Sequence, residues 1–263
     1  MKSCIIAFAM YSKIPMPKVE WNEKNMKYVI CYFPLIGVVI AALELLVFFI
    51  CEQLQIGSLL RGILLTIVPI MITGGIHMDG FLDTVDARNS YADREKKLEI
   101  LKDPHAGAFA IIKGIVYCLL QVGFFSEVTF SGLVFLSVVF VFSRALSGFA
   151  LANFKGAKET GLLASFAGGA DKKVVSFAMI GYGIVGLIGL FGLLFYSGMQ
   201  MENLILIVGI CISCLLTFAY YHFFSYREFH GITGDIAGYF LQLVELTTLI
   251  TCVIIEKVGP WFF

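Results

Sequence analysis

The chain has 263 residues, of which 59% are hydrophobic and only 14% are charged, and its mean hydropathy is +0.89. Soluble domains carry about 25% charged residues, so this composition excludes an ordinary soluble domain and indicates an integral membrane protein. The formal net charge is zero, and we therefore expect no nucleic-acid partner. The seven cysteines are scattered singly, apart from Cys211 and Cys214, and show no disulfide framework.

The predicted elements begin with a short interfacial segment. Its apolar stretch of roughly seven residues is too short to cross a bilayer, and no convincing cleavage site follows it. Apolar segments of spanning length then occur at 28–51, 57–76, 106–126, 130–152, 174–197, 203–225 and 236–256. We therefore predict an all-α, polytopic membrane bundle of about seven transmembrane helices, in a single domain covering residues 1–263.

The distribution of Lys and Arg predicts the orientation of these spans. Five lie in residues 1–27, five in 77–105 and four in 153–173, whereas three short connections carry none, namely 52–56, 127–129 and 198–202. Cytoplasmic connections carry the excess of Lys and Arg, so we predict a cytoplasmic N-terminus in the cell (inner) membrane. All seven aspartates lie on the same predicted side, which predicts an active site that faces the cytoplasm.

The densest charge follows the second apolar segment, in "GGIHMDGFLDTVDA" at 74–87. On a helix, Asp79, Asp83 and Asp86 fall within about 60° of one another. Such like charges repel, and a divalent cation would neutralise them. Oxygen ligands favour Mg²⁺ or Mn²⁺, and Mg²⁺ is typically held by one or two carboxylates plus substrate phosphates. We therefore predict a Mg²⁺ site at these three aspartates; the alternative is that they only cap and solvate a helix end.

Two further polar segments contain candidate site residues. In "LEILKDPHAGAFA" at 98–110, Lys102 and Asp103 precede Pro104, which predicts a charged loop before the next span. In "HGITGDIAGYFLQLVE" at 230–245, Thr233 and Asp235 form a tight turn into the last span. A solvated loop and a helix cap at Thr233 are the respective alternatives.

Several charged residues are predicted to lie inside the spans, and three of them, Glu245, Arg144 and Lys113, bear on the question of partners. Glu245 lies about three turns into the last span, and Arg144 is its candidate partner because it lies at a similar depth. Lys113 also needs a partner, which the sequence does not identify.

These motifs, in this order, resemble the cobalamin synthase family, the adenosylcobinamide-GDP ribazoletransferases. "FAMYSKIPMP" at 8–17 and "GLLASF" at 161–166 strengthen the resemblance, which covers nearly the whole chain. It implies that α-ribazole, or α-ribazole 5′-phosphate, attacks adenosylcobinamide-GDP, so that GMP leaves and adenosylcobalamin or its 5′-phosphate forms. The expected partners are these small molecules and the lipid bilayer, and a homo-oligomer is left open.

This interpretation assigns roles to the charged residues. His77 is the candidate general base, with Asp86 as its rival, and positive side chains would bind phosphate oxygens. The residues assigned to catalysis are His77, Asp83, Asp86 and Lys102. Those assigned to substrate binding are Arg88, Arg94, Asp103, Arg144, Thr233 and Asp235.

Two other classes of function are alternatives. One is another membrane transferase with a diphosphate-linked substrate, of the CDP-alcohol or prenyl type, but the aspartate spacing and the single dense block argue against both. The other is an ion-coupled transporter, because Glu44, Lys113, Arg144 and Glu245 could mark an ion path. The very short connections on the side opposite the aspartates argue against a transporter.

Overall fold

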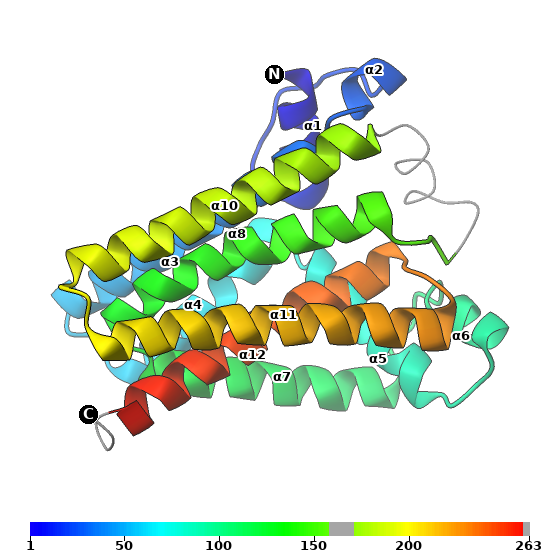
Figure 1. Ribbon diagram of the computed structural model, residues 1–263. Coiled ribbons are helices and arrows are strands. Elements are labelled where there is room, and N and C mark those ends of the chain that lie inside the picture. The colour runs from blue at the N-terminus through cyan, green and yellow to red at the C-terminus, as the bar shows by residue number, and fades with distance from the viewer. Residues whose placement is uncertain (158–170, 260–263) are drawn as a thin grey trace.

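The regular structure of the protein is helical throughout the described residues, 1–157 and 171–259, of the computed structural model (Figure 1). This confirms the predicted all-α fold, while the "GLLASF" motif lies outside the described residues. The helices are α1 (Lys2–Tyr11), α2 (Glu23–Met26), η1 (Ile30–Tyr32), α3 (Phe33–Gln53), α4 (Ser58–Thr73), α5 (Ile76–Asn89), α6 (Arg94–Ile100), α7 (Ala108–Glu127), α8 (Phe130–Asn153), α10 (Lys172–Tyr196), α11 (Met201–Phe229) and α12 (Gly234–Val258).

The spans agree with the prediction of about seven, with one interruption. Among the described residues, six stretches are long and apolar enough to cross a membrane, and they contain α3, α7, α8, α10, α11 and α12. The predicted span at 57–76 corresponds to α4, which reaches spanning length only together with α5, and the axes of the two helices differ by 95°. The apolar helix α1 is too short to span, as predicted.

Two consecutive glycines produce the bend between α4 and α5. Gly74 and Gly75 have φ angles of 65° and 79°, in the left-handed region that glycine adopts most readily. The Gly74 N–H caps the end of α4, and α5 then starts in a new direction. The expected connection at 77–105 is therefore mostly helical, because α5 and α6 occupy most of it. This corrects the predicted boundary of the second span.

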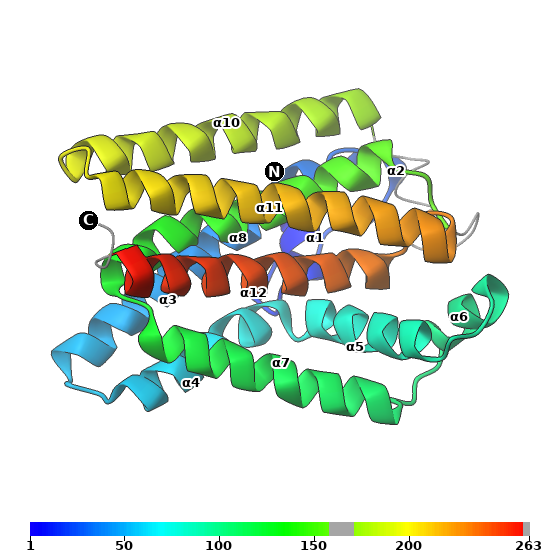
Figure 2. The same cartoon turned by 60° about the horizontal axis from the view of Figure 1, so that its bottom comes forward.

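Helices α8 and α12 form the centre of the bundle. They have the largest share of buried residues among the candidate spans, whereas α10 and α7 have the smallest. Helix α12 packs against α5, α7, α8 and α11, and Figure 2 shows it between α11 and α7. Side chains on α5 are therefore positioned by the most buried part of the molecule.

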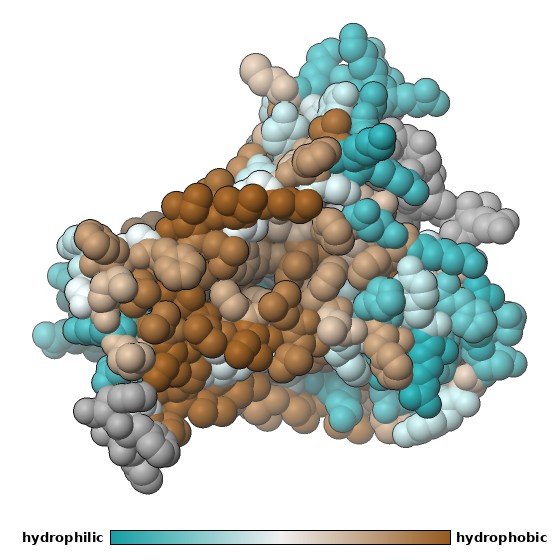
Figure 3. Space-filling view, in the orientation of Figure 1, coloured by the Kyte–Doolittle hydropathy of each residue, from teal (hydrophilic) through white to brown (hydrophobic). Residues whose placement is uncertain are grey.

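The charged connections gather at one end of the bundle, which we call the polar end. It comprises residues 86–107, 154–157, 226–235 and the start of α10. Residues 154–157 and 230–233 meet in a β-bridge between Gly156 and Ile232. Hydrophobic side chains cover the left and middle of the face in Figure 3, and hydrophilic ones gather at this right-hand end. The predicted grouping of these connections is confirmed, while their membrane side stays a prediction.

Candidate functional site

The aspartates at 79, 83 and 86 lie on one helix, as the sequence predicts. Helix α5 begins directly after the Gly74–Gly75 bend, and Asp79 is in its first turn, where a carboxylate interacts favourably with the helix dipole. Asp79 is exposed, whereas Asp83 and Asp86 are half-buried. The three carboxylates therefore follow one side of α5, which we call the aspartate stripe.

A fourth carboxylate joins the stripe from α12. A Cβ atom added at Gly80 would lie 2.7 Å from the backbone oxygen of Asp235, so only glycine permits this approach of the two helices. Asp79, Asp235 and Asp86 all act electrostatically on Asp83. Among the described residues, no Lys or Arg forms an ion pair with Asp79 or Asp83. The negative charge of Asp79 and Asp83 is therefore not neutralised by a Lys or Arg among the described residues.

Asp86 differs from the other two aspartates because both of its oxygens are engaged. They accept hydrogen bonds from the backbone N–H groups of Gly107 and Ala110, the latter at 2.8 Å. These groups belong to the start of α7, whose N-cap is Gly107 and brings no side chain to accept them. Asp86 thus caps α7 and fixes the 101–107 loop against α5.

The donor atoms of the stripe suit a hard divalent cation only in part. Asp79 and Asp83 are one helical turn apart and supply carboxylate oxygens, which Mg²⁺ prefers. Across residues 1–157 and 171–259, no three His, Cys, Asp or Glu side chains come together closely enough to hold an ion. The stripe can therefore supply two carboxylate ligands, and the remaining ligands of an octahedral ion would come from elsewhere.

His77 lies beneath the stripe, in the interior of the bundle. Its side chain is 4% exposed, and its ring meets Phe33 edge-on at 5.8 Å between centroids. Gly238 of α12 lies close to the His77 backbone, so the first turn of α5 packs directly against α12. Neither ring nitrogen has a hydrogen-bond partner among the described residues, which is unusual for a buried polar group.

The turn before α12 combines a helix cap with a candidate substrate contact. Thr233 accepts a hydrogen bond from the Ile236 N–H at 3.3 Å and donates one to Asp235 at 3.3 Å. The alternative reading of Thr233 as a helix cap is therefore confirmed. The cap also orients the Asp235 side chain near the stripe.

Lys102 and Asp103 lie in the loop between α6 and α7. Lys102 is exposed. The backbone N–H of His105, 3.0 Å from the Asp103 carboxylate, together with the His105 ring holds the pKa of Asp103 below its usual value. Because Asp86 fixes the end of this loop, the loop is held at the edge of the stripe.

The predicted partnership of Arg144 and Glu245 is confirmed. Their side chains form an ion pair in the centre of the bundle, where Arg144 is 1% exposed. Ser143 donates to the same carboxylate oxygen at 3.1 Å. This pair joins α8 to α12, and Arg144 is close enough to act electrostatically on His77.

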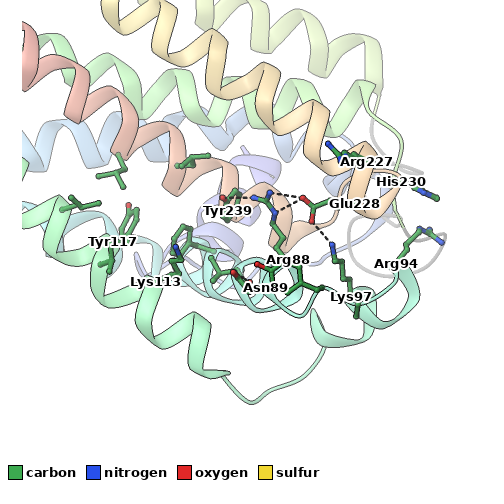
Figure 4. A pocket seen from close by; sticks show the side chains of 18 residues that line it. Arg88, Asn89, Arg94, Lys97, Lys113, Tyr117, Arg227, Glu228, His230 and Tyr239 are labelled. Carbon is green, nitrogen blue, oxygen red and sulfur yellow. Dashed lines mark hydrogen bonds and ion pairs between the residues drawn. The ribbon is translucent and has the colours of Figure 1, made fainter.

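Arg88 lies on the side of α5 opposite the stripe, about 180° from Asp79. It binds Glu228 at 2.9 Å, and its guanidinium also donates to Tyr220 and Tyr239. Figure 4 shows Arg88, Glu228 and Tyr239 of this network, which Lys97 joins through Glu228. Sequence reasoning missed Glu228 and both tyrosines because they come from α11 and α12.

Arg94 connects the segments of the polar end. Its guanidinium donates to the backbone oxygens of Phe229 at 3.0 Å and Ala157 at 2.9 Å. It thereby holds α6 against the end of α11 and residues 154–157. Of the predicted phosphate-binding cations, only Lys102 is left without an acidic or backbone partner among the described residues.

Comparison with known proteins identifies relatives over the full length of the chain. The family model described as Cobalamin-5-phosphate synthase matches residues 3–253. A protein of Lachnoclostridium phytofermentans named adenosylcobinamide-GDP ribazoletransferase is 46% identical, covering 100% of this chain and 99% of the relative. Proteins of the same name from Clostridium perfringens and Treponema denticola are 34% and 33% identical, each over 95% of this chain. No solved structure matches the chain.

Proposed function

Because the chain belongs to the cobalamin-5-phosphate synthase family, we propose that it is an adenosylcobinamide-GDP ribazoletransferase, the activity in the names of its relatives. The substrates are adenosylcobinamide-GDP and α-ribazole or its 5′-phosphate. The names of the relatives favour this activity over transfer of CDP-alcohol or prenyl groups and over ion transport.

The reaction breaks a phosphoanhydride bond and forms a phosphate ester bond. A ribose hydroxyl oxygen bonds to the phosphorus nearest cobinamide, the bond from that phosphorus to the GMP oxygen breaks, and the hydroxyl proton passes to a base. Phosphoryl transfer of this kind depends mainly on positioning and charge stabilisation. The observation that supports this site is the pair of Asp79 and Asp83, which form no ion pair with a Lys or Arg of the described residues and lie on a helix packed against the start of α12.

Asp79 and Asp83 would hold the Mg²⁺ ion of this reaction. With two carboxylates in place, the substrate diphosphate would supply further oxygen ligands. The ion would neutralise the negative charge that develops on the diphosphate. Asp86, which the sequence placed with the ligands, has both oxygens at the start of α7, and we assign it to orienting the 101–107 loop and its Lys102 toward the substrate.

We retain His77 as the candidate base in preference to Asp86. The ring nitrogens of His77 have no partner among the described residues, whereas the oxygens of Asp86 already accept backbone hydrogen bonds. Thr233 and Asp235, on the turn that faces Gly80, would contact the substrate from α12. We propose that this site faces the cytoplasm, in agreement with the Lys and Arg distribution.

A two-substrate assay on the purified protein in lipid nanodiscs tests this proposal. With adenosylcobinamide-GDP, α-ribazole and Mg²⁺, we expect GMP and the cobalamin product to appear in equal amounts. Chelation of Mg²⁺ should stop both, and added Mg²⁺ should restore them. GMP release without the cobalamin product would indicate hydrolysis instead, and the absence of both would contradict the assigned activity.

A further inference from the structure

A cavity of about 890 Å³ lies on the side of α5 that faces away from the aspartate stripe. Its floor is formed by α5 and α12, and its sides by α7 and, at the polar end only, by Arg227 and Glu228 at the end of α11. Helices α7 and α11 both pack against α12, but among the described helices they make little contact with each other. The cavity is therefore a lateral groove between two membrane helices, which we call the α7–α11 groove (Figure 4).

The groove changes from cationic to apolar along its length. Toward the polar end it is lined by Arg88, Lys97 and Arg227, and deeper in the bundle by apolar side chains of α7 and α12. Val116 and Leu120, which line the deeper part, are 45% and 38% exposed. The groove thus opens onto the apolar surface of the bundle while its polar part carries positive charge.

Among the described residues, the positive charge that lines the groove exceeds the negative charge. This part of the lining contains five Lys or Arg side chains and one carboxylate, Glu228. Arg88 and Lys97 both bind that carboxylate. Lys113 and Arg227 are exposed and have no acidic partner among the described residues. The groove therefore attracts an anion from outside the protein.

The position of Lys113 constrains what this anion is. It lies about 7.5 Å along α7 from Ala108, and its neighbours Ile112 and Ile115 are 55% and 56% exposed. An ammonium group at such a position either extends toward the water or meets a negative group at the membrane surface. A phosphate diester attached to an acyl chain matches both the charge and the apolar floor of the groove.

We propose that the α7–α11 groove binds an anionic phospholipid, with the phosphate beside Lys113 and an acyl chain along Val116 and Leu120. Basic pockets between transmembrane helices bind such head groups. Because α5 separates the groove from Asp79 and Asp83, this site is distinct from the proposed metal and diphosphate site. A soluble phosphate ester shares the head-group chemistry but has no acyl chain to occupy the apolar part.

Lipid retention distinguishes these two sources of phosphate. The protein is placed in nanodiscs of equal parts phosphatidylglycerol and phosphatidylcholine and then extracted, and mass spectrometry measures the ratio of the two lipids retained. We expect phosphatidylglycerol to be enriched. Lys113→Gln should lower this enrichment about fivefold, which corresponds to the binding energy that one basic residue contributes near an anionic membrane surface. Lys113→Arg should keep the enrichment. So should Lys173→Gln, which removes an exposed lysine of the polar end outside the groove.

Two outcomes would overturn the proposal. One is equal retention of both lipids by the unmodified protein, or an enrichment that Lys113→Gln leaves unchanged. The other is displacement of phosphatidylglycerol by millimolar inorganic phosphate, which would assign the groove to a soluble phosphate compound. Turnover measured on the same samples shows that each variant is folded, because Lys113 lies outside the proposed catalytic site.

Discussion

Asp83 is the residue on which the proposed site depends most. Three other carboxylates act on it, and α12 packs so closely at Gly80 that the side chains have little room to separate. Mutual repulsion of this kind costs stability unless a cation offsets it. The same charge that destabilises the metal-free protein would therefore bind Mg²⁺ and the diphosphate.

The substitution Asp83→Asn removes one charge and keeps the shape of the side chain. We expect almost complete loss of GMP release and a higher melting temperature in metal-free buffer, because repulsion within the stripe falls. The matched control is Asp93→Asn, at the N-cap of α6, where Asn caps as well as Asp. Unchanged turnover in Asp83→Asn would show that the stripe only solvates a helix.

The buried pair of Arg144 and Glu245 provides a second residue-scale prediction. Replacing Glu245 with Gln leaves Arg144 charged in the centre of the bundle, which typically costs about 3–5 kcal/mol. We expect a large decrease in the free energy of unfolding, measured by denaturant titration in detergent. Glu127→Gln, which breaks an exposed pair with Lys257, should have little effect. Equal effects of the two variants would contradict the assigned burial.

At the scale of elements, the orientation of α5 determines which residues meet. Helical periodicity predicted the stripe and places Arg88 on the opposite side. It could not identify the partners of Arg88, because Glu228 and Tyr239 are 140 and 151 residues away in the chain. The pairing of Arg144 with Glu245 was predictable because a charge buried in a span needs an opposite charge, and few residues of opposite charge lie at the same depth in another span. The bend at Gly74 and Gly75 was missed because the apolar pattern continues up to it.

The contact between α5 and α12 is tested by Gly80→Ala. The added Cβ would lie 2.7 Å from the Asp235 backbone, so the two helices must separate. We expect a lower melting temperature and a loss of turnover larger than the loss of stability explains, since Asp235 moves away from the stripe. Gly123→Ala on α7 is the control, because nothing lies within 4 Å of its added Cβ. If both variants behave alike, the close approach has no role in the site.

At the scale of the whole molecule, the polar end and the opposite end must face different sides of the membrane. In a cysteine-free background, single cysteines at Ser90, after α5, and Gln200, before α11, should react with an impermeant reagent from opposite sides. The Lys and Arg distribution predicts that Ser90 is the cytoplasmic one. Labelling of both positions from the same side would contradict the arrangement of spans.

The central claim is that Asp79 and Asp83 hold Mg²⁺ together with the substrate diphosphate. It is tested most directly by the affinity of the purified protein for adenosylcobinamide-GDP, without α-ribazole, in the presence and absence of Mg²⁺. Because each ligand must strengthen binding of the other by the same factor, we predict a gain of at least tenfold, about 1.4 kcal/mol. The gain should vanish in Asp79→Asn. Equal affinity with and without Mg²⁺, together with Mg²⁺-dependent turnover, would contradict this assignment and place the ion away from the diphosphate.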